Sequence, residues 1–103
     1  MTHWKDNIPK LSSSDAEEIT RLVGLPGFEF ALFPQDDKFA MATGMFTERK
    51  FHHLTNLLDE RLKGTRYERS GITRSLWHDE DGLREYTLSV RARATNLSNL
   101  SGG

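Results

Sequence analysis

The sequence contains one long amphipathic segment, TERKFHHLTNLLDERLK, which spans residues 47–63. Its apolar side chains recur every three or four residues, the spacing of one face of an α-helix. The members of this stripe are Phe51, Leu54, Leu58 and Leu62. Thr47 is a favourable N-cap, and Gly64 can take the left-handed conformation that often ends a helix. The segment therefore predicts a helix that fills the centre of the hydrophobic core.

Two strand-like segments precede this helix, at residues 28–33 and 38–45, and residues 34–37 have the composition of a turn. Pairing Phe33 with Lys38 gives a hairpin whose side chains alternate between two faces. The predicted core face consists of Phe28, Phe30, Leu32, Phe39, Met41 and Thr43. The opposite face is unusually small and comprises Ala31, Ala40, Ala42 and Gly44, with Phe33. Small side chains permit close approach, so this second face predicts contact with the N-terminal helix of the same chain or with a second copy in a homodimer.

A second hairpin is predicted after the helix, from residues 72–80 and 83–95. The Asp-Gly pair at 81–82 is a strong signal for a two-residue turn, and it places Trp77 opposite Tyr86. A longer Asp-Glu-Asp-Gly loop is the alternative, and it would change these partners. In the tight hairpin, one face carries Trp77, Tyr86, Leu88, Val90, Ala92 and Ala94. The other face carries Ile72, Arg74, Leu76, His78, Arg91 and Arg93.

A short helix is predicted before the first hairpin. Ser14 and Glu17 have the spacing of a capping box, while Gly24 and Pro26 end the segment. Its narrow apolar stripe consists of Ala16, Ile19, Leu22 and Val23. A helix of about nine residues is marginal in isolation, so we expect it to pack on the rest of the chain.

The element order α-β-β-α-β-β predicts an α+β fold. The central helix, about 24 Å long at 1.5 Å per residue, can carry the chain back along the sheet. The next strand then runs parallel to residues 38–45, through a crossover connection. We therefore predict a four-stranded mixed sheet with helix 47–63 packed on its aromatic face. Residues 65–70 are polar and are consistent with either a strand or a loop.

Length and composition are typical of one small domain, which we place at residues 1–95, with an extended arm at 1–11 and a flexible tail at 96–103. The 14 basic and 15 acidic residues leave a net charge of −1, so no global field favours nucleic acid or anionic lipid. The absence of cysteine excludes thiol and disulfide chemistry. No apolar run reaches the length of about 18 residues that a membrane span needs, so we expect a cytoplasmic protein without a membrane partner.

Candidate catalytic and metal-binding groups are scattered along the chain. His52 and His53 are adjacent on the predicted helix and point about 100° apart, so they do not readily share a metal ion. A site that combines His52 with His78 and Asp79 would need these residues to be brought together by the fold. Carboxylates in turns are explained by turn propensity alone. There is no glycine-rich phosphate loop or Gly-x-Ser-x-Gly elbow. We therefore expect no catalytic residue, metal site or cofactor.

The candidate interaction face combines apolar, aromatic and basic side chains: Phe33, Ile72, Arg74, Leu76, His78, Arg91 and Arg93. The leading hypothesis is a non-catalytic interaction domain that regulates or inhibits a protein partner, in the manner of adaptor, immunity or phage-type inhibitor proteins. The alternative is a binder of nucleic acid, or of a small phosphorylated or nucleotide ligand, through Arg74, Arg91 and Arg93. A third hypothesis is a small hydrolase or isomerase that uses His78 beside an acidic residue.

Overall fold

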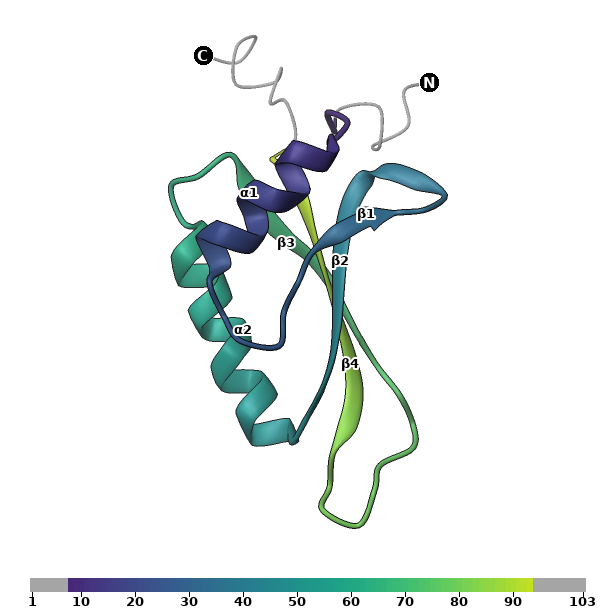
Figure 1. Cartoon of the computed structure of the whole chain (residues 1–103). Coiled ribbons are helices and arrows are strands. Elements are labelled where there is room, and N and C mark those ends of the chain that lie inside the picture. Colours follow the sequence, from purple (N-terminus) through teal and green to yellow (C-terminus); the bar gives the residue numbers. More distant parts are fainter. Residues whose placement is uncertain (1–7, 94–103) are drawn as a thin grey trace, which may run out of the picture.

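The computed structural model describes residues 8–93, in which two helices lie on one face of a four-stranded sheet (Figure 1). The elements are, in chain order, α1 (Ser13–Val23), β1 (Ala31–Phe33), β2 (Asp36–Phe46), α2 (Glu48–Leu62), β3 (Tyr67–Arg74) and β4 (Arg84–Ala92). This architecture confirms the predicted α+β class and element order. The predicted tail at 96–103 and residues 1–7 of the predicted arm lie outside the described residues.

The strand order is β1-β2-β4-β3, and every neighbouring pair is antiparallel. The prediction of a mixed sheet is therefore wrong, although α2 does return the chain in the predicted direction. β3 runs the same way as β2 because both are antiparallel to β4, which lies between them. The reason is hydrophobicity. Alternate residues of β4 are buried along its whole length, whereas only the first residue of β3 is buried, so the apolar strand takes the centre and the polar strand takes the edge.

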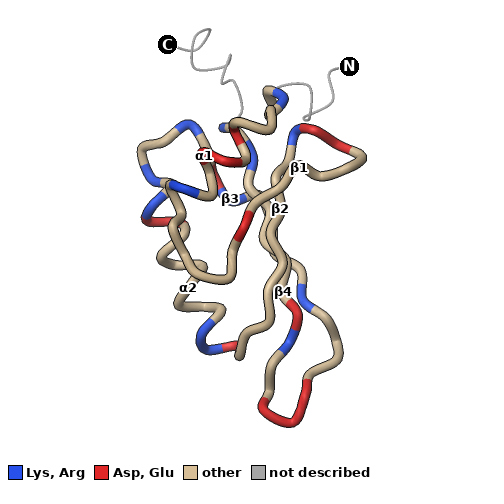
Figure 2. Tube along the Cα trace, viewed as in Figure 1, with Lys and Arg blue, Asp and Glu red and all other residues tan. Residues whose placement is uncertain are grey.

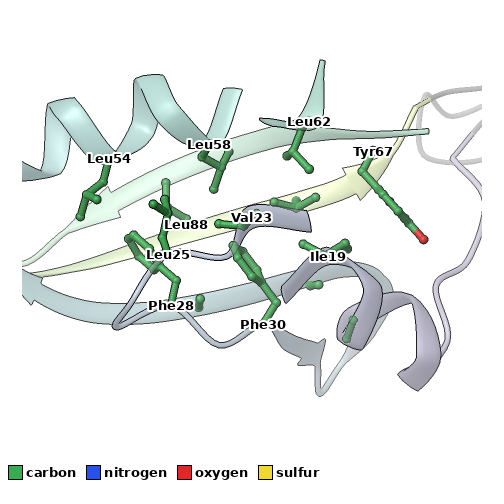
Figure 3. Close-up of a cluster of buried hydrophobic side chains, with 14 of the residues drawn as sticks. Ile19, Val23, Leu25, Phe28, Phe30, Leu54, Leu58, Leu62, Tyr67 and Leu88 are labelled. Atoms are coloured by element: carbon green, nitrogen blue, oxygen red, sulfur yellow. The ribbon is translucent and has the colours of Figure 1, made fainter. Parts of the chain in front are cut away.

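One hydrophobic core lies between the helices and the sheet (Figure 3). From α2 it receives the whole predicted stripe: Phe51, Leu54, Leu58 and Leu62. From β4 it receives Tyr86, Leu88, Val90 and Ala92, as predicted for that strand. The rings of Phe51 and Tyr86 stack with their centroids 3.9 Å apart and an interplanar angle of 11°. Large side chains that are fully buried contribute about 1.5–3 kcal/mol each, so this stripe is the main attachment of α2 to the sheet.

The helix ends follow local sequence signals, with one correction. Thr47 caps α2 as predicted, because its hydroxyl accepts a hydrogen bond from the Lys50 amide. Gly24 ends α1 in the left-handed conformation at φ 57°. The capping box of α1, however, joins Ser12 to Asp15, so the predicted Ser14 box is wrong and the helix begins earlier. Any of the three consecutive serines could cap the helix. Ser12 is the one that does so, because Asp15, three residues later, is held in place by the rest of the fold.

The predicted register of the first hairpin is wrong by one residue. Leu32 lies opposite Ala40 instead of Phe39, and a bulge follows Leu32, so that Phe33 faces Asp36. A shift of one residue turns every side chain of a strand to the other face. The small residues of β2 are therefore the buried ones, with Ala40 fully buried, whereas Phe39 is half-buried on the side away from the helices.

The small face of β2 is covered within the chain. Phe28 and Phe30 precede β1 as an irregular segment, instead of belonging to a strand, and both are buried in the core. The Phe30 amide donates a hydrogen bond to the Thr20 hydroxyl of α1. Of the two predicted ways to cover the small side chains, contact within one chain is thus the one that the structure provides, while the homodimer stays a prediction. Within residues 8–93, no helix has both the length and the apolar character needed to cross a bilayer.

Candidate interaction site

The β3–β4 hairpin extends beyond the N-terminal end of α2 and ends in a long loop, residues 75–83 (Figure 1). Arg74 lies opposite Tyr86, three residues away from the predicted register. The predicted pairing of Trp77 with Tyr86 and the two-residue turn are therefore wrong, and the longer loop that the sequence left open is present. Tyr86 takes Phe51 of α2 as its aromatic partner, which leaves Trp77 outside the core.

The tip of the loop is built by hydrogen bonds around Asp79. The Asp79 carbonyl accepts from the Gly82 amide at 3.0 Å, and the Asp79 amide donates to the Leu83 carbonyl at 3.0 Å. The Asp79 carboxylate also accepts from the amides of Asp81 and Leu83, both at 2.9 Å. Gly82 has φ 80°, which only glycine adopts without strain. The side chain of Asp79 therefore extends the turn and displaces the predicted two-residue geometry.

The base of the loop is also ordered. The Ser75 amide donates to the Glu85 carbonyl at 2.9 Å, and the Glu85 amide donates to the Ser75 hydroxyl oxygen at 3.2 Å. The Ser75 hydroxyl in turn donates to the Trp77 carbonyl at 2.8 Å. Hydrogen bonds at both the base and the tip restrict the backbone conformations of the loop. The loop is therefore a preorganised projection of the sheet.

The loop presents two large apolar side chains to solvent. Leu76 is 93% exposed and Trp77 is 65% exposed. Met45, at the adjoining end of β2, and Ile72, on β3, are 44% and 42% exposed. Among the described residues, only one other large apolar side chain is comparably exposed, Phe33. Exposed apolar side chains thus gather toward one end of the molecule, with Met45 and Ile72 on opposite faces of the sheet and Leu76 and Trp77 together on the loop. Contiguous exposure such as that of Leu76 and Trp77 marks interaction surfaces more often than scattered exposure does.

The loop is also acidic. Residues 75–83 contain Asp79, Glu80 and Asp81 and no lysine or arginine. Figure 2 shows these three residues as an acidic tip at the end of the hairpin. Glu80 and Asp81 are exposed to solvent. A negative, apolar projection is therefore the most distinctive surface feature of the described chain.

The structure divides the predicted interaction face among three places. Ile72, Arg74, Leu76 and His78 lie along β3 and the loop that follows it. Arg91 and Arg93 lie at the other end of β4. Phe33 lies beside the turn between β1 and β2. Sequence reasoning missed Trp77, because the tight-turn register assigned it to the core; the alternative loop of residues 79–82 was the signal that would have placed it outside.

The predicted arginine face does not form a single positive surface. Arg74 lies opposite Tyr86, on the face that bears the helices, where it is 3.7 Å from a Glu48 carboxylate oxygen. Arg91 lies on the opposite face, with its guanidinium 2.9 Å from Glu68. Arg93 contacts the second carboxylate oxygen of Glu68 at 3.1 Å. Each predicted phosphate-binding arginine therefore has a carboxylate partner within the chain.

The histidines are not assembled into a site. His78 is exposed in the loop, with Nδ1 3.0 Å from the backbone carbonyl oxygen of Asp79. His52 lies on α2, 4.0 Å from Glu48, and His53 is exposed. Within residues 8–93, histidine and carboxylate side chains form no group of three that could hold a metal ion. The neighbour of the His78 ring is therefore a backbone carbonyl oxygen. The hypothesis of a hydrolase or isomerase needs a carboxylate at that position.

Sequence reasoning missed one buried polar cluster. Tyr67, the first residue of β3, is buried with its hydroxyl directed away from the apolar cluster (Figure 3). This hydroxyl donates to the carboxylates of Asp15 and Glu18 on α1, and the Arg66 guanidinium contacts the same carboxylates. The bond from Tyr67 is the main cause that lowers the pKa of Asp15 and of Glu18. Burial, followed by these two carboxylates, raises the pKa of Tyr67.

This cluster attaches α1 to the sheet. Asp15 also forms the capping box of α1, so one carboxylate serves both the helix end and the contact with β3. The structure settles the predicted ambiguity of residues 65–70, because β3 begins at Tyr67, whose ring is buried, and residues 65–66 precede the strand. A capping acid in the first turn of α1 gives no sequence signal for a tyrosine about fifty positions later, so the pairing was not predictable.

A shallow depression of about 490 Å³ lies between α1 and the segment before β1. It is lined by Glu17, Thr20, Arg21, Glu29 and Phe30. Its three charged residues are exposed to solvent, so none is desolvated in the way that an acid or base in an active site commonly is. The depression has space for a small group, but the residues that line it form no catalytic arrangement.

Comparison of the chain with protein-family models, with curated proteins and with solved structures found no match. Function must therefore be inferred from the geometry of the chain itself. The feature that stands out in that geometry is the ordered, acidic hairpin loop with Leu76 and Trp77 in solvent.

Proposed function

We propose that the chain is a non-catalytic interaction domain that regulates or inhibits a protein partner, and that loop 75–83 makes the central contact. The observation that supports this proposal is the exposure of Leu76 and Trp77 on a loop whose backbone is held by hydrogen bonds. Tryptophan is among the residues most enriched at energetic centres of protein interfaces. The location remains a prediction, and we retain the cytoplasm and no membrane partner as the expectation.

The energetics favour a binding role for the loop. Leaving a leucine or a tryptophan in water forgoes roughly 1.5–3 kcal/mol that burial would supply. Ordering the loop also costs conformational entropy, which folding has already offset here. A partner that covers Leu76 and Trp77 gains the apolar burial without that ordering cost. Preorganisation of this kind increases the affinity available from a given contact area.

The experiment that tests the proposal begins with isolation of the partner from the source cell on the intact chain. Binding of the purified partner is then measured by calorimetry for the wild type, for Leu76→Asp and for Trp77→Ala. We expect each change to weaken binding by about 2 kcal/mol or more, as for residues at the centre of an interface. Circular dichroism checks that both variants keep the fold.

The matched control is Phe33→Ala, which removes an exposed aromatic side chain beside the other hairpin turn. This change should leave partner binding within a factor of about three of the wild type, which corresponds to roughly 0.6 kcal/mol. Failure of the intact chain to retain any protein would count against the proposed function. Equal losses from Phe33→Ala and Trp77→Ala would count against the loop as the central contact.

Binding of nucleic acid, or of a phosphorylated or nucleotide ligand, is the second proposal. Its support is weaker, because Arg91 and Arg93 share Glu68 and Arg74 lies on the other face beside Glu48. A phosphate ligand would have to displace these carboxylates. A salt titration separates the two proposals: phosphate-driven binding weakens steeply as salt rises, whereas a mainly apolar contact does not.

A further inference from the structure

The charge of the loop specifies the chemistry of the surface that would receive it. We infer, building on the proposed protein-binding function, that the partner presents an apolar pocket bordered by lysine or arginine side chains. Leu76 and Trp77 enter the pocket, and the acidic tip of the hairpin faces its cationic border. The partner is therefore a protein with a basic cleft, as distinct from a lipid surface or a nucleic acid.

The exposed carboxylates of the tip differ from those that join elements of the fold. Asp15, Asp59 and Glu68 each hold an arginine, at contacts between α1, α2 and the strands. Within the described residues, no lysine or arginine pairs with Glu80 or Asp81. Carboxylates concentrated at the end of a projection repel one another, and cations of a partner would relieve that repulsion.

The position of the apolar pair relative to the charges defines the pocket. Leu76 and Trp77 lie on the strand side of the loop, between its base at Ser75 and the turn that begins at Asp79. Because Glu80 and Asp81 follow Trp77 by three and four residues, a partner surface that covers both apolar side chains has a rim beside these carboxylates. Uncompensated carboxylates at such a rim would be costly to desolvate, so the rim must supply positive charge.

The two other macromolecular classes fit the loop poorly. A membrane would accept Trp77 at its interface, but it would also draw the acidic tip against lipid headgroups, and anionic headgroups repel carboxylates. A nucleic acid would place phosphates against the same carboxylates. A basic protein cleft satisfies both the apolar and the acidic part of the loop.

A crosslinking experiment on the full chain tests the position of the contact. A photoreactive phenylalanine analogue replaces Trp77 in one protein and Phe33 in another, and each is illuminated in lysate of the source cell. We expect an adduct from position 77 and none from position 33. Unlabelled wild type should abolish the adduct by competition, whereas Leu76→Asp should not.

A titration with the purified adduct partner tests its chemistry. The variant Glu80→Gln/Asp81→Asn keeps Asp79, which builds the turn, and the control Glu17→Gln/Glu29→Gln removes the same charge from exposed sites on and after α1. At about 50 mM salt the tip variant should bind roughly three- to tenfold more weakly than the wild type, and near 300 mM that difference should disappear. The control should bind as the wild type does at both salt concentrations.

Each other result overturns part of the inference. An adduct from position 33 alone would move the contact away from the loop while leaving a protein-binding function in place. An adduct from position 77, with equal binding by the tip variant at low salt, would contradict the cationic border. Sedimentation with phosphatidylcholine vesicles that depends on Trp77 would assign the loop to a membrane. Retention of no protein, with no adduct from either position, would contradict both this inference and the proposed function.

Discussion

The two hairpins of the sheet each carry large apolar side chains but place them in opposite environments. In the first, Phe28 and Phe30 are buried in the core before β1, at 4% and 6% exposed. In the second, Leu76 and Trp77 follow the strand ITR at 72–74 and remain in solvent. The difference is the presence of a second layer: α1 covers the approach to β1, whereas no described element covers the end of the β3–β4 hairpin (Figure 1). An apolar run is thus buried only where another layer reaches it.

The largest expected effect on the free energy of unfolding comes from the buried residues of the first hairpin. Phe30→Ala removes a ring from the core between α1 and β2, and it should lower the free energy of unfolding by about 3–5 kcal/mol. The cost combines lost apolar burial with the cavity that remains. Urea denaturation followed by circular dichroism measures it, and a loss below about 1 kcal/mol would show that the first hairpin is no better packed than the second.

A close approach on β2 gives the next effect. A Cβ atom at Gly44 would lie 2.5 and 2.8 Å from ring atoms of Phe46, which is itself packed against Phe28. Gly44→Ala should therefore destabilise the chain by about 1–3 kcal/mol through overpacking. Gly71→Ala on β3 is the matched control, because its Cβ would meet only the Ser89 hydroxyl at 3.3 Å. The same denaturation measurement compares the two, and an equal loss would contradict the packing explanation.

A substitution at Tyr67, the first residue of β3, should have a smaller effect on the free energy of unfolding. Tyr67→Phe keeps the buried ring but removes the hydroxyl that donates to Asp15 and Glu18. We expect a loss of about 1 kcal/mol in the free energy of unfolding, the usual net value of one such interaction. Thermal unfolding at neutral pH measures it. A neutral result would mean that Arg66 alone suffices to hold the two carboxylates.

Acid provides the control for this cluster. In the folded chain the pKa values of Asp15 and Glu18 lie below their ordinary values of 3.8 and 4.5. The folded state therefore binds these protons less readily than the unfolded chain does, so the stability from this cluster is present above pH 4.5 and is lost as pH falls through the lowered pKa values. Tyr67→Phe should flatten that part of the stability–pH curve. An unchanged curve would mean that groups other than Tyr67 lower the pKa values of Asp15 and Glu18.

The smallest expected effect lies at the exposed end. Leu76→Ala and Trp77→Ala should change the free energy of unfolding by no more than about 0.5 kcal/mol, because these side chains make few contacts that unfolding would lose. Denaturation of each single variant beside Phe30→Ala provides the direct contrast. A loss comparable with that of Phe30→Ala would show that the loop residues belong to the core, which would remove the basis for a binding role.

The outcome of sequence reasoning differed between helices and strands. The bounds of α2 and its buried stripe followed from spacing and from Thr47, because a helix is specified by contacts three or four residues apart. The registers of both hairpins were wrong. In the first, a bulge after Leu32 changed the face of β2; in the second, hydrogen bonds from the Asp79 carboxylate lengthened the loop. Each error placed an exposed side chain on the predicted core face. Because of the second error, Trp77 was predicted to be buried.

Local patterns were enough to establish two helices, both ends of α2, the C-terminal end of α1, the inward residues of β4 and a strong turn signal near Gly82. Contacts between distant segments were needed for the rest. Ala40 and Ala42 share one buried core with aromatic rings from before β1 and from α2, and Tyr67, at the start of β3, meets α1 through its hydroxyl. The physical reason is range: a backbone hydrogen bond within a helix reaches four residues, whereas strand register is chosen by whichever side chains the other layer brings to each face.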